Sequence, residues 1–115
     1  MKKYETVKLE KDFNNIIKKG HFIKNNYFVI YNLPNDLTFP RFGLAVGKKL
    51  GNAVERNKFK RQLRSIIDEN KKYFNKGQDY IIMIKGTCKS IKFSEMKESF
   101  ASLIKEKKWK SISKY

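Results

Sequence analysis

The chain of 115 residues has one cysteine, two prolines and no long apolar run. A single cysteine cannot pair within the chain, which excludes an internal disulfide framework and is compatible with a reducing compartment. No apolar segment follows the basic N-terminal residues, and no stretch approaches the ~20 apolar residues of a membrane span. We therefore expect a cytoplasmic protein without a signal peptide, and no partner in a membrane.

Acidic side chains are scarce as well. The chain carries 27 Lys and Arg against 11 Asp and Glu, a formal net charge of +16. The excess positive side chains repel one another, and a polyanionic partner would relieve this repulsion. Nucleic acid is the commonest such partner. A basic domain kept soluble by self-repulsion and a peripheral membrane protein are the alternatives. The length allows one hydrophobic core, so residues 1–115 are expected to form a single domain with basic N- and C-terminal tails.

Candidate catalytic residues are also few. The one histidine, His21, follows Gly20 at the start of a predicted strand, a place more typical of a structural or surface residue. The carboxylates are dispersed without metal-ligand spacing, and there is no glycine-rich phosphate loop. Cys88 has no CxxC partner. The residues themselves therefore predict no catalytic site and no metal site.

Hydrophobic periodicity predicts the order α-β-β-β-α-β-α. This order indicates an α+β fold, a two-layer α/β sandwich in which three helices pack on a sheet of roughly four strands. The strand–helix–strand unit between residues 41 and 84 would ordinarily have a right-handed crossover. Helices are expected at 10–19, 53–68 and 94–107, with Ser94 as a cap, and strands at 22–24, 27–32, 41–46 and 79–84, the last one central.

The segment KKLGNAVERNKFKRQLR, residues 48–64, combines seven Lys or Arg with one carboxylate, Glu55. Asn52 is well placed as a helix N-cap, and Glu55 completes a capping box three residues later. At about 100° per residue, the apolar side chains gather on one side of this helix and the cations on the adjoining side. The segment is thus predicted to dock on a core while it presents cations to phosphate.

A second candidate surface mixes aromatic and cationic residues, a combination that suits single-stranded nucleic acid. Its members are Phe13, Ile17, Tyr27 and Tyr31 amid Lys18, Lys19 and Lys24. The alternative is that Phe13 and Ile17 are simply the buried side of the first helix. In the predicted strand 41–46, Gly43 and Ala45 leave one face bare, which invites close approach by a helix or by a ligand backbone.

Residues 48–64 resemble the signature of the bacterial ribonuclease P protein component, whose Arg-Asn-Arg-type segment is present as Arg56-Asn57-Lys58. The stretches LEKDFNNIIKKG, YFVIY, RFGLAV and DYIIMI resemble the opening helix and three strands of that family. The resemblance covers a core of about residues 8–106. Lys58 keeps the charge without the arginine fork. Ile17 stands where family members often have an aromatic residue, and Asn26 where a basic residue is frequent.

The resemblance implies the protein subunit of a ribonucleoprotein that removes the 5′ leader of precursor tRNA. The RNA subunit would be the catalyst, with Mg²⁺ held mainly by that RNA and no cofactor bound by protein side chains. The protein would be monomeric, one copy per RNA, and would raise the affinity for substrate and metal. It also implies a left-handed crossover and a fold like the second domain of ribosomal protein S5.

The same resemblance implies two sets of binding residues. The catalytic RNA would contact Lys48, Lys49, Asn52, Arg56, Asn57, Lys58, Lys60, Arg61 and Arg64. The single-stranded leader would occupy a cleft lined by Phe13, Ile17, Val29 and Tyr31. Two other functions stay open. One is a structural RNA-binding protein of ribosomal type, and the other is a nuclease that needs no RNA subunit.

Overall fold

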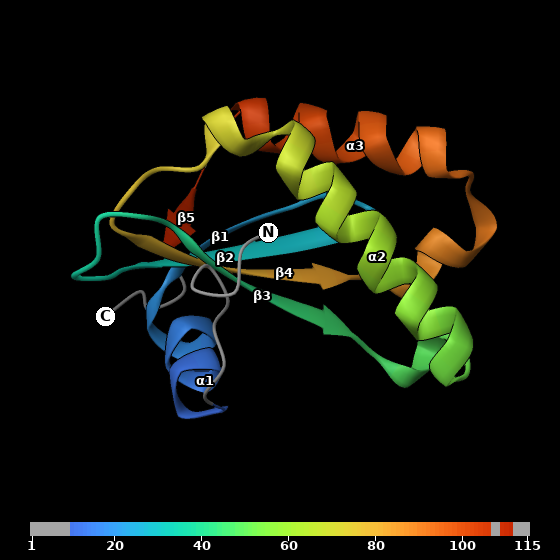
Figure 1. Cartoon of the computed structure of the whole chain (residues 1–115), viewed down its shortest axis with the longest axis horizontal. Coiled ribbons are helices and arrows are strands. Elements are labelled where there is room, and N and C mark those ends of the chain that lie inside the picture. The colour runs from blue at the N-terminus through green and yellow to red at the C-terminus, as the bar shows by residue number, and fades with distance from the viewer. Residues whose placement is uncertain (1–9, 107–108, 112–115) are drawn as a thin grey trace.

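The computed structural model describes residues 10–106 and 109–111. The helices and strands follow the predicted order, with one short strand added at the C-terminal end (Figure 1). They are α1 (Glu10–Lys19), β1 (His21–Lys24), β2 (Phe28–Pro34), β3 (Arg41–Val46), α2 (Ala53–Glu69), β4 (Gln78–Ile84), α3 (Phe93–Glu106) and β5 (Lys110–Ser111). Short 3₁₀ helices are η2 (Lys48–Leu50), η3 (Lys71–Tyr73) and η4 (Gly86–Ser90).

The predicted tails have different outcomes. The N-terminal tail, residues 1–8, lies outside the described residues. Part of the C-terminal tail joins the fold, because Trp109 packs against the main core and β5 pairs with β1. In the part of the chain that the structure describes, no helix is both long and apolar enough to span a bilayer.

The sheet has the strand order β3-β4-β2-β1-β5. Strands β3 and β4 are parallel, and the other neighbouring pairs are antiparallel. Strand β4 lies between β3 and β2, so that Ile82 is paired with Leu44 on one side and Ile30 on the other. Tyr80 and Ile82 face one layer and Ile81 the other, and all three are buried. The prediction of a central strand covered on both faces is confirmed.

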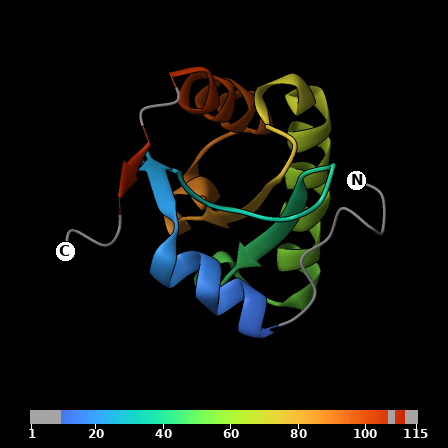
Figure 2. The same cartoon turned by 90° about the vertical axis from the view of Figure 1, so that its left-hand side faces the viewer.

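The helices lie on both faces of this sheet. Helices α2 and α3 cover one face, and α1 covers part of the other (Figures 1 and 2). The main core lies under α2 and α3, where Phe74 packs edge-on against Phe42 and Tyr80 with ring centroids 4.9 and 4.8 Å away. A smaller cluster lies under α1, around the buried side chains of Ile16 and Ile81. The fold is the predicted α+β sandwich, with α1 on the face that α2 and α3 leave free.

The connection from β3 through α2 to β4 is a left-handed crossover, as two perpendicular views show (Figures 1 and 2). The general rule for parallel strands predicts the opposite hand. The hand implied by the family resemblance is therefore correct, and the rule-based expectation is wrong. The crossover places α2 over the sheet face that it shares with α3, with η2 directly before its first turn.

Several predicted boundaries differ by one or two residues from those observed, and two of these differences have a clear cause. Helix α3 begins at Phe93, because the Met96 amide already donates to the Lys92 carbonyl at 3.0 Å, so Ser94 lies inside the first turn. Strand β2 continues to Pro34, which is paired with Gln78 of β4. Proline is tolerated at the end of a strand, where its missing amide removes little from the ladder. Turn residues alone do not reveal how far a partner strand extends.

Candidate nucleic-acid interface

Helix α2 begins with the predicted capping box. The Asn52 Oδ1 accepts from the Glu55 amide at 3.0 Å, and the Glu55 Oε1 accepts from the Asn52 amide at 3.3 Å. A carboxylate at this place also interacts favourably with the positive end of the helix dipole. The one acidic side chain of residues 48–64 is thus held at the helix start.

The 3₁₀ helix η2 is fixed directly in front of α2. Leu50 is buried in the main core, while Lys48 and Lys49 are exposed. Gly51 joins the two helices with φ 116°, a conformation that favours glycine, and a Cβ there would lie 2.5 Å from the Glu55 carboxylate. The two lysines therefore continue the surface of α2 in one basic region.

The buried side of α2 consists of Leu63, Ile66 and Ile67, with Phe59 half-buried beside them. Its remaining surface carries the cations. We call the residues Arg56, Asn57, Lys60, Arg61 and Arg64 the basic face of α2. Asn57, Arg61 and Arg64 are exposed, and Arg56 and Lys60 are half-buried.

No cation of the basic face forms an ion pair with any residue of the described ranges. The buried Nε of Arg56 also has no hydrogen-bond partner in that part of the chain. Positive charge is therefore concentrated here without internal neutralisation. Such a surface attracts phosphate, and its attraction is screened by salt.

Lys58 lies apart from this face. At about 100° per residue it is turned away from Arg56 and Lys60, toward the other flank of α2. There it lines a hollow with Phe59, Cys88 and Phe93. The segment Arg56-Asn57-Lys58 thus points in three directions and cannot contact one flat surface with all its side chains.

The second predicted surface lies on the opposite face of the sheet. Phe13 and Ile17 of α1 and Tyr31 of β2 are half-buried in one cluster with the buried Ile16 and Ile81. Val29 is half-buried two residues before Tyr31, hence on the same strand face, and is paired with Met83. We use the name α1 cleft for Phe13, Ile17, Val29 and Tyr31, the residues that the family resemblance implies as the lining of the leader site. Ile16 is the residue of α1 that is fully buried against the sheet, whereas Phe13 and Ile17 beside it remain partly exposed.

Tyr27 does not belong to this surface, against the sequence-based expectation. It precedes β2, in a turn where the Asn25 Oδ1 accepts from the amides of Tyr27 and Phe28 at 2.9 Å each. The turn directs the tyrosine toward the main core, against which its ring packs. Alternation along a strand predicts a face only inside the strand.

The bare face of β3 is used in two ways. At Gly43 a Cβ would lie 2.9 Å from the Phe13 ring and 2.6 Å from the Ile81 Cδ1, so close packing of α1 explains this glycine. Beyond α1 the face is open, and Ala45 lines a hollow of about 460 Å³. Met83, Lys85 and Lys49 line it as well. The sequence does not predict that Met83 and Lys85 line this hollow; the only indication of a hollow here is the run of small residues on β3.

The side chains with potential catalytic chemistry are dispersed, and Asp79 has structural partners. His21 is exposed at the start of β1. Asp79 is buried and accepts from Arg41 Nε at 2.8 Å, Arg41 Nη2 at 2.6 Å and Asn35 Nδ2 at 2.6 Å. This hydrogen bonding with Asp79 raises the pKa of Arg41. Within the described ranges, no three His, Cys, Asp or Glu side chains gather where they could hold a metal ion.

Cys88 is expected to resist thiol reagents. Its buried Sγ lies 3.5 Å from the Tyr27 carbonyl oxygen, and burial raises the pKa of its thiol from 9.0 to about 11. Since the thiolate is the reactive form, a rise of two units lowers its population about a hundredfold at pH 8. A thiol-reactive disulfide reagent should therefore label the native chain at least that much more slowly than the urea-unfolded chain. Equal rates would contradict the burial.

Comparison with known proteins shows the family of this chain. The family model described as Ribonuclease P matches residues 1–108. The chain belongs to the ribonuclease P protein family. The ribonuclease P protein component of Streptococcus mutans is 39% identical over 105 residues, covering 91% of this chain and 87% of that protein. The component of Bacillus cereus is 36% identical over 115 residues, covering 99% and 100%.

Solved ribonuclease P proteins share the fold. A Staphylococcus aureus RNase P protein mutant with defective mRNA degradation activity superposes with TM-score 0.83 at 34% identity, covering 94% of this chain and 92% of that one. The RNase P protein from Thermotoga maritima gives TM-score 0.79 at 32% identity, covering 89% and 96%. The resemblance read from residues 48–64 is confirmed at the level of family and fold.

Proposed function

We propose that this chain binds a ribonuclease P RNA and assists it in removing the 5′ leader of precursor tRNA. The observation that carries the proposal is the basic region of η2 and α2, whose cations have no ion-pair partner in the described ranges. Membership in the ribonuclease P protein family supports a ribonuclease P RNA as the partner of this region. The RNA-binding residues are the nine predicted from the sequence, with Lys58 on a separate flank.

The α1 cleft is the proposed site of the leader. Its aromatic side chains, Phe13 and Tyr31, are half-exposed and lie on the sheet face opposite α2. An unpaired strand needs stacking surfaces for its bases, and a duplex does not. The chain would thereby hold the catalytic RNA and the leader on different surfaces, and one protein would bring both together.

The chemical step belongs to the RNA in this proposal. No three His, Cys, Asp or Glu side chains of the described ranges gather where they could hold a metal ion, and in this proposal the Mg²⁺ that the reaction is expected to use is held mainly by the RNA. The cations of the protein neutralise phosphate repulsion between the two nucleic acids. Close approach of substrate then needs fewer counterions, so we expect the protein to raise the affinity for substrate and to lower the Mg²⁺ concentration at which the complex works.

Reconstitution tests the proposed function. The protein is mixed with a bacterial ribonuclease P RNA and precursor tRNA at low magnesium, with protein-alone and RNA-alone controls. We expect release of the 5′ leader only when both components are present. No stimulation by the protein would favour a structural RNA-binding protein of ribosomal type. Cleavage by the protein alone would show a nuclease that needs no RNA subunit.

Tyr31→Ala is expected to weaken binding of leader-bearing precursor tRNA to the reconstituted complex by roughly tenfold, the effect of losing one stacked base. Binding of mature tRNA without a leader should be unchanged, because it does not reach the α1 cleft. Tyr73→Ala is the matched control, since that half-buried tyrosine lies in η3 against the main core on the other sheet face. Equal effects on both tRNAs would contradict the assignment of the cleft.

A further inference from the structure

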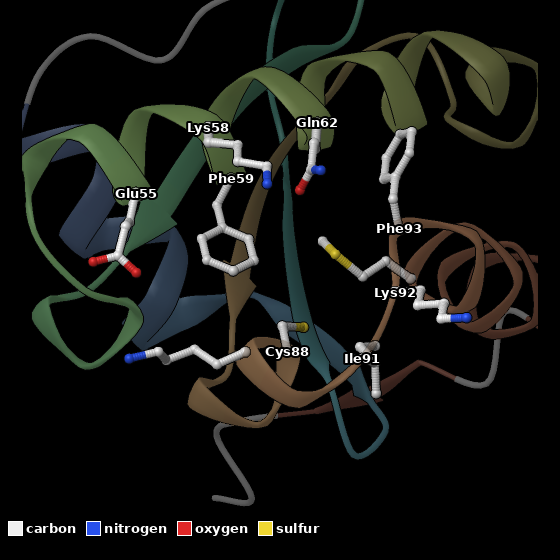
Figure 3. Close-up of a pocket in the computed structure, with 10 residues that line it drawn as sticks. Glu55, Lys58, Phe59, Gln62, Cys88, Ile91, Lys92 and Phe93 are labelled. Atoms are coloured by element: carbon white, nitrogen blue, oxygen red, sulfur yellow. The ribbon is translucent and has the colours of Figure 1, made fainter.

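A second hollow lies on the sheet face that carries α2 and α3, away from the α1 cleft (Figure 3). We call it the α2–α3 groove, and its volume is about 430 Å³, within the usual range for a ligand site. One wall is α2, and the other is the segment from η4 to the start of α3. It is lined by Glu55, Lys58, Phe59, Gln62, Cys88, Lys89, Ile91, Lys92, Phe93 and Met96.

The interior of the groove is apolar and aromatic. Phe59 extends into it from α2, and Phe93 extends toward it from the opposite wall (Figure 3). Both rings are half-buried, so each keeps surface that a planar group could cover. Cys88 and Met96, which belong to the main core, close the bottom. Aromatic walls of this kind are suited to stacking with a nucleobase.

One polar side chain reaches into this apolar space. Gln62 projects from α2 into the groove between the two phenylalanines (Figure 3). It is half-buried, and its amide forms no hydrogen bond with another residue of the described ranges. A free amide offers donors and an acceptor together, the combination needed to pair with the edge of a base.

The rim of the groove is positively charged. Lys58, Lys89 and Lys92 are exposed around it, and none has an ion-pair partner in the described part of the chain. The one carboxylate at the groove, Glu55, is engaged in the capping box of α2. The groove therefore combines a stacking interior with a rim complementary to phosphate.

We propose that the α2–α3 groove binds one unpaired nucleotide of the ribonuclease P RNA. Its base lies between Phe59 and Phe93 with its edge on the Gln62 amide, and the adjoining phosphates contact Lys58, Lys89 and Lys92. The inference rests on the proposed function, because it requires the RNA to bind α2.

Continuity favours this occupant over a free nucleotide or an acidic peptide. Lys58 and Arg61 are three residues apart and so are neighbours on the helix surface. An RNA bound to the basic face therefore reaches the rim of the groove. The groove extends the RNA contact to residues 58–62 and 89–93 on a flank that the basic face does not include.

Charge reversal at the rim tests the phosphate contacts. The double variant K89E/K92E is compared with K72E/K76E, which changes the net charge equally at exposed lysines of η3 and the following turn, far from the groove. We expect affinity for ribonuclease P RNA to fall at least about tenfold further in K89E/K92E than in the control. For K89E/K92E, the slope of log affinity against log salt should also become shallower by roughly 1.5, as expected for two lost phosphate contacts. Equal losses in both variants would overturn the inference.

Nucleotide-resolution chemical probing of the RNA, free and bound, tests the base contact. The variant F59L/F93L keeps the walls apolar but removes both rings, and circular dichroism checks that it is folded. We expect one unpaired site to lose protection in F59L/F93L and K89E/K92E and to keep it in K72E/K76E. Protection that is the same in every variant would overturn the inference.

Three further outcomes are distinguished by these experiments. Failure of the wild-type chain to bind the RNA would refute the proposed function. Normal binding by the wild type, together with groove variants that match the control, would refute the groove alone. Saturable binding of nucleoside monophosphates by the free protein, without any groove-dependent protection of RNA, would assign the site to a free nucleotide and overturn the proposal.

Discussion

Replacement of Lys60, Arg61 and Arg64 together by alanine is expected to weaken binding to ribonuclease P RNA about a hundredfold near physiological salt. Each phosphate contact releases a counterion, so its loss lowers the affinity several-fold and makes the remaining affinity less dependent on salt. The plot of log affinity against log salt should flatten by roughly two to three units. The folded chain should be preserved, because Arg61 and Arg64 are exposed and none of the three has an ion-pair partner in the described ranges.

Filter binding across a salt series measures both quantities. The matched control replaces Lys72, Lys76 and Lys105 by alanine, three exposed lysines that lie at the far end of α2 from η2 and remove the same total charge. We expect this control to lose only the small part due to net charge. If both triple variants weaken binding alike, the basic face of α2 is not the RNA-binding surface. An affinity that does not depend on salt would refute the electrostatic basis of the proposal.

Gly20→Ala is expected to destabilise the fold by about 3 kcal/mol, the upper part of the range for an overpacked site. A Cβ on Gly20 would lie 2.0 Å from the Asn32 carbonyl oxygen of β2 and 2.7 Å from the Ile16 carbonyl oxygen of α1. Both atoms belong to the backbone of packed elements, so neither can turn aside as a side chain could. The clash should separate α1 from β2 and disturb the α1 cleft with it.

Thermal unfolding followed by circular dichroism measures this effect. For a chain of this size, 3 kcal/mol corresponds to a fall in Tm of roughly 10–20 °C. Gly47→Ala is the control, because nothing lies within 4 Å of a Cβ built on Gly47. We expect its Tm to stay within a few degrees of the wild type. A Gly20→Ala chain that melts with the control would show that α1 and β2 adjust freely.

The most informative local pattern in the sequence is the start of α2. Asn52 and Glu55 predict the capping box, and the spacing of Phe59, Leu63 and Ile66 predicts the docked side. Both depend on contacts within a few residues, so the order of residues is sufficient to specify them. The predictions of a buried strand from the apolar run of β4 and of a helix end at Gly20 are correct for the same reason.

The α1 cleft could be predicted only in part. Phe13, Ile17 and Tyr31 come together as expected, since they occupy the buried-side positions of one helix and one strand. The prediction for Tyr27 is wrong, because the direction of its side chain depends on the turn that Asn25 forms rather than on strand alternation. For Gly43 the sequence allowed a helix or a ligand, and the packing of the Phe13 ring on Ile81 shows that a helix occupies the place.

The sequence by itself determined the secondary-structure order, the α+β class, the capped basic helix and the family. The left-handed crossover was implied by the family resemblance alone, against the general rule for parallel strands, and the structure confirms it. Only the tertiary structure decided that Lys58 leaves the basic face and that residues 58–62 meet residues 88–93 in a groove. The physical reason is how far apart along the sequence the interacting residues lie. Periodicity and capping arise between neighbours along the chain, whereas the angle at which α2 docks is set by its packing on elements distant in sequence. That angle determines which flank of the basic helix faces solvent and which faces α3.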